Sequence, residues 1–161
     1  EARGFDLEQI ARDYVDVLNR VIEWKPEDLV VNMHICRGNF RSTWFSSGGY
    51  EPVAKTLFGH CRVDGFFLEY DSDRAGDFTP LRFIKNQKVV LGLITSKSGD
   101  LEDKGEVISR IKEASQYVPL EQLCLSPQCG FSSTEEGNIL TIEAQWDKLK
   151  LIDEIVHEVW G

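Results

Sequence analysis

The sequence predicts an α/β protein with a parallel sheet, and within that class the carboxy-terminal half of a (β/α)8 TIM-barrel type fold. Short apolar runs alternate with amphipathic segments along the whole chain, which is typical of βα units. Four strand-like runs and about five helix-like segments amount to half of an eight-stranded barrel. An open four-stranded parallel sheet is the alternative. A half barrel on its own would expose two long apolar edges, which favours a portion of a larger barrel.

The individual elements follow from apolar spacing and from the residues that begin or end it. Apolar side chains recur at helical spacing over residues 5–24, and Pro26 ends the pattern. Pro52 suits the first turn of the second helix. In the last helix, Leu149 is among the residues expected to face inward. The expected helices are 5–24, 50–60, 81–85, 101–117 and 141–160, the expected strands are 29–36, 65–70, 88–94 and 123–126, and 38–49 is a long loop.

The composition favours one soluble domain over residues 1–161 that acts on a small molecule. Its net charge of -9 argues against a nucleic-acid surface, which needs a basic face, and against binding to anionic lipid. No apolar run approaches the length of a membrane span. No secretory signal is visible, so we expect a cytoplasmic protein whose four cysteines are thiols or metal ligands rather than disulfides. Because the chain does not begin with Met, we expect it to be trimmed or part of a longer product.

Four potential metal ligands, His34, Cys36, Glu69 and Cys129, lie at the ends of predicted strands. Because side chains alternate along a strand, His34 and Cys36 point to one face and can bind one ion. The active site of a (β/α)8 barrel lies at the carboxy-terminal ends of its strands, where all four residues fall. One imidazole, two thiols and a carboxylate suit zinc. The sequence therefore predicts a Zn2+ site built from separate strand ends.

Each of these residues also has a simpler explanation. His34 and Cys36 fit an ordinary buried strand, because free cysteine packs like a small hydrophobic residue. Glu69 fits a surface carboxylate or a partner of Arg74, and Cys129 fits an ordinary turn. Their joint position at successive strand ends favours the metal site.

Three segments carry a resemblance to a known family: Met33-His34-Ile35-Cys36, Phe67-Leu68-Glu69 and Ser126-Pro127-Gln128-Cys129-Gly130. They resemble the carboxy-terminal catalytic domain of cobalamin-independent methionine synthase, and the resemblance runs from about residue 29 to the end of the chain. The chain looks most similar to the short, methionine-synthase-like members of that family. The resemblance implies a (β/α)8 barrel in which the four candidate residues bind a catalytic zinc.

The resemblance also implies a 5-methyltetrahydropteroyltriglutamate-homocysteine S-methyltransferase activity in methionine biosynthesis. A methyl group would pass from a methylated folate, a corrinoid or another methylated small molecule to the homocysteine thiol. Two thiolates and a carboxylate over-neutralise zinc and leave a bound sulfur electron-rich. We expect Glu69, the hardest ligand, to loosen when that sulfur arrives. Asp71, at the mouth of the site, and Ser96 are candidates for substrate contact.

The chain departs from the family at three places. At the end of the third strand the family has a His, whereas this chain reads Leu93-Ile94-Thr95-Ser96-Lys97-Ser98. A proton-donating role for that His therefore does not carry over. Gln128 stands where the family favours Asp, and the acidic residues that hold the homocysteine amine would precede residue 1.

Two other classes of protein compete with a methyltransferase. In the first, the chain is a non-catalytic fragment or domain whose zinc site is structural, closed and four-coordinate. In the second, it is a metal-free barrel relative such as a decarboxylase, and the His-Cys-Glu-Cys set argues against that class. An incomplete barrel could also pair edge to edge with a second copy, which would make a homo-oligomer.

Overall fold

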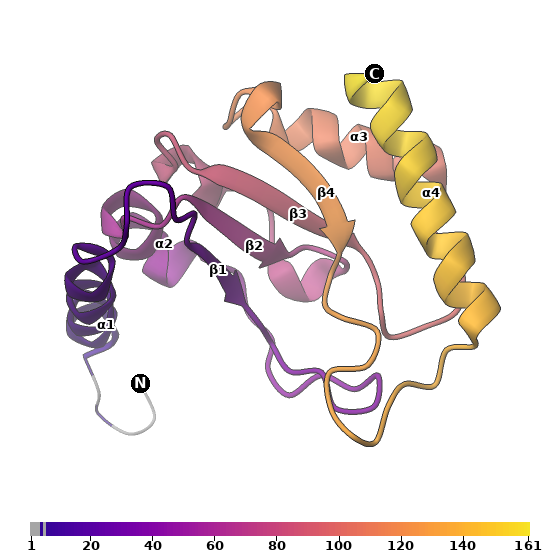
Figure 1. Cartoon of the computed structure of the whole chain (residues 1–161), viewed down its shortest axis with the longest axis horizontal. Helices are drawn as coiled ribbons and strands as arrows, with labels where there is room; N and C mark the ends of the chain where they lie inside the picture. Colours follow the sequence, from indigo (N-terminus) through magenta and orange to yellow (C-terminus); the bar gives the residue numbers. More distant parts are fainter. Residues whose placement is uncertain (1–3, 5) are drawn as a thin grey trace.

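The computed structural model describes residue 4 and residues 6–161 and shows an α/β structure built on a parallel sheet (Figure 1). The strands β1 (Asn32–Ile35), β2 (Gly65–Glu69), β3 (Lys88–Ile94) and β4 (Leu123–Pro127) lie side by side in that order. All three pairings are parallel, so the carboxyl ends of the strands meet at one edge of the sheet. The predicted α/β class with a parallel sheet is confirmed.

Helices connect the strands and bury one face of the sheet. Phe66, Leu68 and Leu91 from the strands are fully buried with Phe58 and Ile111 from the helices. Burial of each such side chain contributes about 1.5–3 kcal/mol. Among the described residues, none of the helices combines the length and the apolarity needed to cross a membrane. The helical elements are α1 (Leu7–Ile22), α2 (Glu51–His60), α3 (Lys104–Ala114) and α4 (Ile142–Trp160), with 3-10 turns η1 (Asp73–Ala75), η2 (Thr79–Phe83) and η3 (Leu120–Gln122).

The opposite face of the sheet is partly exposed. The strand register aligns His34, Phe67, Val90 and Cys124 in one row across it. The side chain of His34 is 39% exposed and Phe67 is 36% exposed. In Figure 1, α1 packs beside α2 at the β1 side of the sheet, and α4 lies beside β4. The carboxyl end of β1, where His34 and Cys36 lie, is therefore accessible from this face.

The element bounds differ from the predicted ones at their ends. The strand expected over 29–36 shrinks to Asn32–Ile35, because Gly65 begins β2 opposite Asn32 and leaves the earlier residues without a ladder. The first helix begins after Asp6, whose carboxylate accepts two main-chain N–H groups, and position 5 lies outside the described residues. The short helix expected at 81–85 is a 3-10 turn at Thr79–Phe83. The helix expected over 101–117 is shorter, since Asp103 caps its start.

The buried stripe of α4 contains an unexpected lysine. We expected Leu149 to face inward, but the buried residues are Lys148, Leu151 and Ile155. The ammonium group of Lys148 lies 3.1 Å from both carboxylate oxygens of Glu102 and also donates to the carbonyl of Asp100. A buried cation of this kind requires such partners, because its desolvation is costly.

The ion pair between Lys148 and Glu102 also fixes the end of β3. Glu102 accepts the main-chain N–H of Thr95, the residue that follows β3, over 2.7 Å. The pair therefore ties α4 to the strand end beside the candidate site.

Replacing Lys148 with Met should lower the free energy of unfolding by about 3 kcal/mol, because it leaves Glu102 without its buried partner. Urea denaturation followed by circular dichroism measures this change. The matched control is Lys150→Met, which removes an exposed ion pair with Asp147 and should cost less than about 1 kcal/mol. Equal losses in the two variants would contradict the role given to Lys148.

Candidate metal centre

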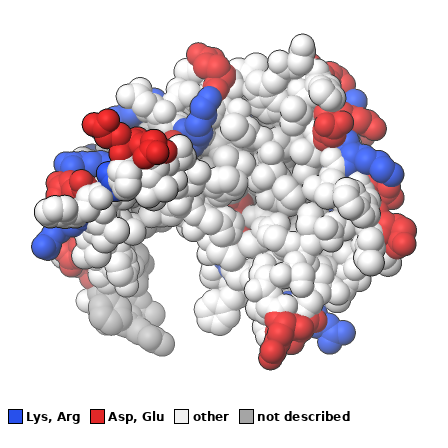
Figure 2. Space-filling view, in the orientation of Figure 1, with Lys and Arg blue, Asp and Glu red and all other residues white. Residues whose placement is uncertain are grey.

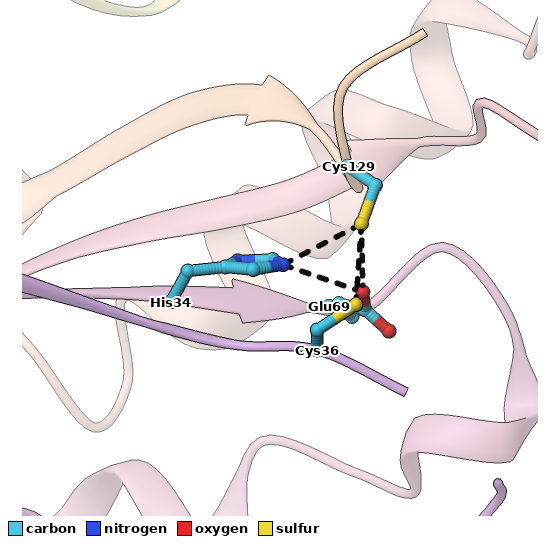
Figure 3. A group of neighbouring side chains, drawn as sticks. All are labelled: His34, Cys36, Glu69 and Cys129. Atoms are coloured by element: carbon cyan, nitrogen blue, oxygen red, sulfur yellow. Dashed lines mark hydrogen bonds and ion pairs between the residues drawn. The ribbon is translucent and has the colours of Figure 1, made fainter. Parts of the chain in front are cut away.

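The side chains of His34, Cys36, Glu69 and Cys129 converge on one point (Figure 3). The sulfur of Cys129 lies 3.2 Å from Glu69 Oε1, 3.4 Å from His34 Nε2 and 3.5 Å from Cys36 Sγ. His34 Nε2 lies 3.6 Å from Glu69 Oε1, and all four donor atoms lie within 4.8 Å of one another. The four residues that the sequence pointed to as ligands are therefore neighbours in space.

Three strands supply these side chains at their carboxyl ends. His34 lies in β1 and Cys36 directly follows it, so strand alternation aims both at the open face. Glu69 is the last residue of β2. Cys129 lies two residues beyond β4, in the turn that Pro127 begins. The parallel sheet brings these ends together although Cys36 and Cys129 are 93 positions apart in the chain.

The spacing and chemistry of the donor atoms fit zinc. Bonds of about 2.0–2.3 Å place the ligand atoms of a tetrahedral zinc roughly 3.3–3.8 Å apart. Four of the six separations between the donor atoms are 3.2–3.6 Å. The other two, from Cys36 to His34 and to Glu69, are within 4.8 Å. An imidazole nitrogen, two sulfurs and a carboxylate oxygen form a borderline-soft set, which suits zinc better than magnesium or calcium.

The two thiols differ in their surroundings. Burial raises the pKa of the Cys129 thiol, and hydrogen bonds to Glu69 and Cys36 act in the same direction. Cys36 is exposed, and its sulfur accepts the N–H of Gly38 over 3.2 Å. Gly38 has a φ of +103°, and a Cβ there would lie 2.7 Å from the nitrogen of Phe45. Glycine at this position therefore allows the turn that points its N–H at the sulfur.

Glu69 is the most buried of the four residues, at 1% exposure. Its Oε2 accepts the main-chain N–H of Arg37 over 3.0 Å, and its Oε1 accepts the side-chain amide of Gln128 over 3.0 Å. A buried carboxylate is costly unless it is paired in this way. Both oxygens are held, so the orientation of the carboxylate is set by the protein.

Arg37 is a part of the site that sequence reasoning missed. Its buried guanidinium donates to the carbonyls of Gly48 and Glu69 and to the hydroxyl of Tyr50. It also lies 4.0 Å from Glu69 Oε2. The Tyr50 hydroxyl accepts the N–H of Glu69 over 2.8 Å, and burial raises the pKa of Tyr50 to about 12 although Arg37 opposes this. The available signal was strand alternation, which turns the residue after Cys36 toward the helices, where a charge needs partners.

Ser96 and Asp71, the two residues expected to contact substrate, lie beside the site with their side chains in protein contacts. Asp71 pairs with Arg74 at 3.2 Å and accepts the hydroxyl of Thr95 over 2.9 Å. Ser96 is fully buried and donates to Gln128 over 2.9 Å. Arg74, considered above as a partner of Glu69, is thus engaged with Asp71. Substrate contact by Ser96 and Asp71 stays a prediction.

Lys97 connects the loops on either side of the site. Its ammonium donates to the carbonyl of Gly38 over 3.0 Å and to Asn39 Oδ1 over 2.7 Å. Asn39 in turn donates to the carbonyl of Gly130 over 2.7 Å. Burial lowers the pKa of Lys97, while the negative charges of the site act in the opposite direction. The loops after β1 and β4 are therefore held together across the end of β3.

A mostly apolar cavity of about 370 Å³ adjoins the donor atoms. It is lined by His34 and Cys129 and by the apolar residues Phe67, Pro127 and Phe131. A larger cavity of about 590 Å³ lies at the opposite end of the strands, around His60 and Lys85, away from the donor atoms. Figure 2 shows the molecule in the orientation of Figure 1. Charged side chains gather at the sides of this view, whereas its centre, over the sheet, is largely uncharged. The space beside the donor atoms suits an aliphatic group.

Comparison with curated proteins relates the chain to methionine synthases. No protein-family model matches it. It is 54% identical over 161 residues to the uncharacterized protein YxjH of Bacillus subtilis, a match that covers 99% of this chain and 43% of YxjH. It is 24% identical over 116 residues to the methionine synthase of Pyrococcus horikoshii, covering 72% of this chain and 30% of that protein. The chain is a distant homologue of archaeal methionine synthases. It spans less than half the length of these relatives.

Solved structures match the fold. A putative vitamin-B12 independent methionine synthase from Listeria monocytogenes superposes with a TM-score of 0.76 and 45% identity, covering 98% of this chain and 43% of that one. A B12-independent methionine synthase from Shewanella sp. W3-18-1, in complex with selenomethionine, gives a TM-score of 0.73 at 23% identity, covering 94% and 45%. The second likeness is one of fold alone.

The sulfurs of Cys36 and Cys129 lie close enough to form a disulfide when no metal is bound. In chelator-treated protein, the thiol oxidant diamide should link Cys36 to Cys129, because their sulfurs lie 3.5 Å apart. Peptide mapping by mass spectrometry identifies the link. Cys61, which is buried elsewhere, should stay a free thiol and serves as the internal control. A link from Cys36 or Cys129 to Cys61 or Cys124 instead would contradict the arrangement in Figure 3.

Proposed function

We propose that the chain belongs to a zinc-dependent methyltransferase that moves a methyl group from a methylated folate, or another methylated donor, to the thiol of homocysteine and forms methionine. The observation that carries this proposal is the convergence of His34, Cys36, Glu69 and Cys129 on one point. Homology to proteins named methionine synthase supports the reaction class.

The chemistry of the site suits activation of a thiol. A free thiol has a pKa near about 8.5 and is mostly protonated at neutral pH, whereas the thiolate is the nucleophile. Bound Zn2+ would supply a Lewis acid that holds a substrate sulfur as its thiolate. Cys36, Cys129 and Glu69 would together bring three negative charges against the two positive charges of the ion. The excess negative charge keeps such a sulfur electron-rich.

The protein's own residues would bind and orient the substrate around this point. His34 and Cys36 are exposed on the open face, so a small thiol can approach from that side. The cavity lined by Phe67, Pro127 and Phe131 would take the aliphatic part of the substrate and exclude water from it. Displacement of Glu69 by the incoming sulfur stays a prediction.

We also propose that the observed sheet is part of a (β/α)8 barrel in a longer protein. The strands follow one another in the order β1-β2-β3-β4, as successive strands of such a barrel do. β1 and β4 are the edges of this sheet, and the chain spans 43% of the length of YxjH. Further strands on those edges would complete the barrel and enclose the open face.

A structural zinc site in a non-catalytic chain is the second candidate. It is favoured by the presence of four protein donors, since structural sites are commonly closed by four protein ligands. The two candidates differ in whether an exogenous thiol can reach the ion. In the catalytic case one donor gives way, and in the structural case all four stay bound.

Reconstitution with cobalt in place of zinc separates the candidates. Adding homocysteine to the cobalt protein should produce a new thiolate-to-metal charge-transfer band, because a third sulfur joins the ion. Methionine, which has no thiol, is the matched control and should leave the spectrum unchanged. A spectrum that homocysteine leaves unchanged in metal-loaded protein would contradict catalysis and support the structural site. Methyl-transfer assays with folate and other donors then identify the donor.

A further inference from the structure

β3, the strand whose end supplies none of the four donor atoms, contacts the site through an amide. Ser96 follows β3 and is fully buried. Its hydroxyl donates to Gln128 Oε1 over 2.9 Å. The side-chain nitrogen of Gln128 then donates to Glu69 Oε1 over 3.0 Å. Two consecutive hydrogen bonds thus connect the end of β3 to the carboxylate.

The orientation of the Gln128 amide follows from its neighbours. The main-chain N–H of Ser96, which can only donate, points at the same Oε1 from 3.5 Å. An amide turned the other way would place its NH2 group against that N–H and its oxygen against the Glu69 carboxylate. Both contacts would be repulsive, so the amide is held as a donor to Glu69.

Gln128 is buried in close contact with β3. Gln128 is 2% exposed, and its main-chain N–H donates to the carbonyl of Ile94 over 2.7 Å. Gly92, inside β3, leaves room for it, because a Cβ at that position would lie 2.8 Å from the Cα of Gln128 and 2.9 Å from the carbonyl of Leu68. The strand register between β3 and β4 shifts at the same place. The close approach of the Gln128 backbone to β3 therefore depends on glycine at position 92.

We propose that Gln128, held by Ser96, is a positioning residue that fixes Glu69 for metal binding. The inference rests on the zinc centre proposed above. Glu69 Oε2 is held by the main-chain N–H of Arg37, and Oε1, the oxygen nearest Cys129, is held by Gln128. With one anchor alone, the broad terminal torsion of a glutamate would let Oε1 turn away. With both, the carboxylate stays aimed at the other donors.

Zinc affinity measures this role without any assay of activity. Gln128→Met keeps the length of the side chain and removes the donor, and it should weaken zinc binding by about 10–100-fold in competition with a chromophoric chelator. Ser96→Ala should act in the same direction with a smaller effect, because it loosens Gln128 and leaves the amide in place. The matched control is Gln122→Met, since Gln122 donates to main-chain carbonyls of Lys85 and Gln87 away from the site.

A double-mutant cycle separates positioning from a general structural role. In the Glu69→Gln background, Gln128→Met should cause no further loss of zinc affinity, because it acts through the carboxylate that is already absent. An equal loss in both backgrounds would overturn the inference, since the residue would then act on the fold and not on Glu69. Circular dichroism of each variant shows whether it is folded, and Ser96→Ala carries the test if Gln128→Met is not.

Zinc binding by the unmodified protein shows whether the positioning role alone fails or whether the zinc centre fails with it. If it binds zinc and neither Gln128→Met nor Ser96→Ala changes the affinity, the positioning role is wrong and the zinc centre stands. If the reduced, unmodified protein binds no zinc, both are wrong.

Discussion

The buried carboxylate of Glu69 is the charge on which the arrangement of the strand ends depends. A carboxyl group at 1% exposure is tolerated only where hydrogen-bonding partners or cations surround it. Its partners come from both sides of β2: the backbone of Arg37 after β1, and Gln128 and Cys129 after β4. Satisfying this one group therefore draws together the loops that carry the other donor atoms.

The end of β1 and the two residues that follow it serve both the core and the site. His34 and Cys36 point to the open face, while Arg37 turns to the helix side and is buried with Tyr50. The same arginine reaches the carbonyls of Gly48 and Glu69, so the loop after Cys36 is fixed to the end of β2. Because this cation is desolvated, its loss would leave several acceptors unpaired as well as removing a charge.

The sequence predicted the parallel α/β arrangement. It also indicated as candidate metal ligands the four residues that the structure places together. It succeeded because apolar runs, turn residues and strand alternation are local signals. It did not predict that Gln128 contacts Glu69 or that Lys148 is buried, since both depend on partners far away in the chain. The bounds of β1 also depended on β2, which pairs only from Gly65 onward. Polar residues inside a predicted element are interpreted correctly only once their partners in space are known.

The arrangement of the strand ends predicts that His34, Cys36, Glu69 and Cys129 hold one zinc ion. X-ray absorption at the zinc edge of the purified, reduced protein tests it most directly. We expect one zinc per chain with two sulfur neighbours at about 2.3 Å and two nitrogen or oxygen neighbours at about 2.0–2.1 Å. In Cys129→Ser, one sulfur neighbour should be lost. A shell of four sulfurs, a shell with no sulfur, or the absence of bound zinc would show that these four residues do not form a zinc site.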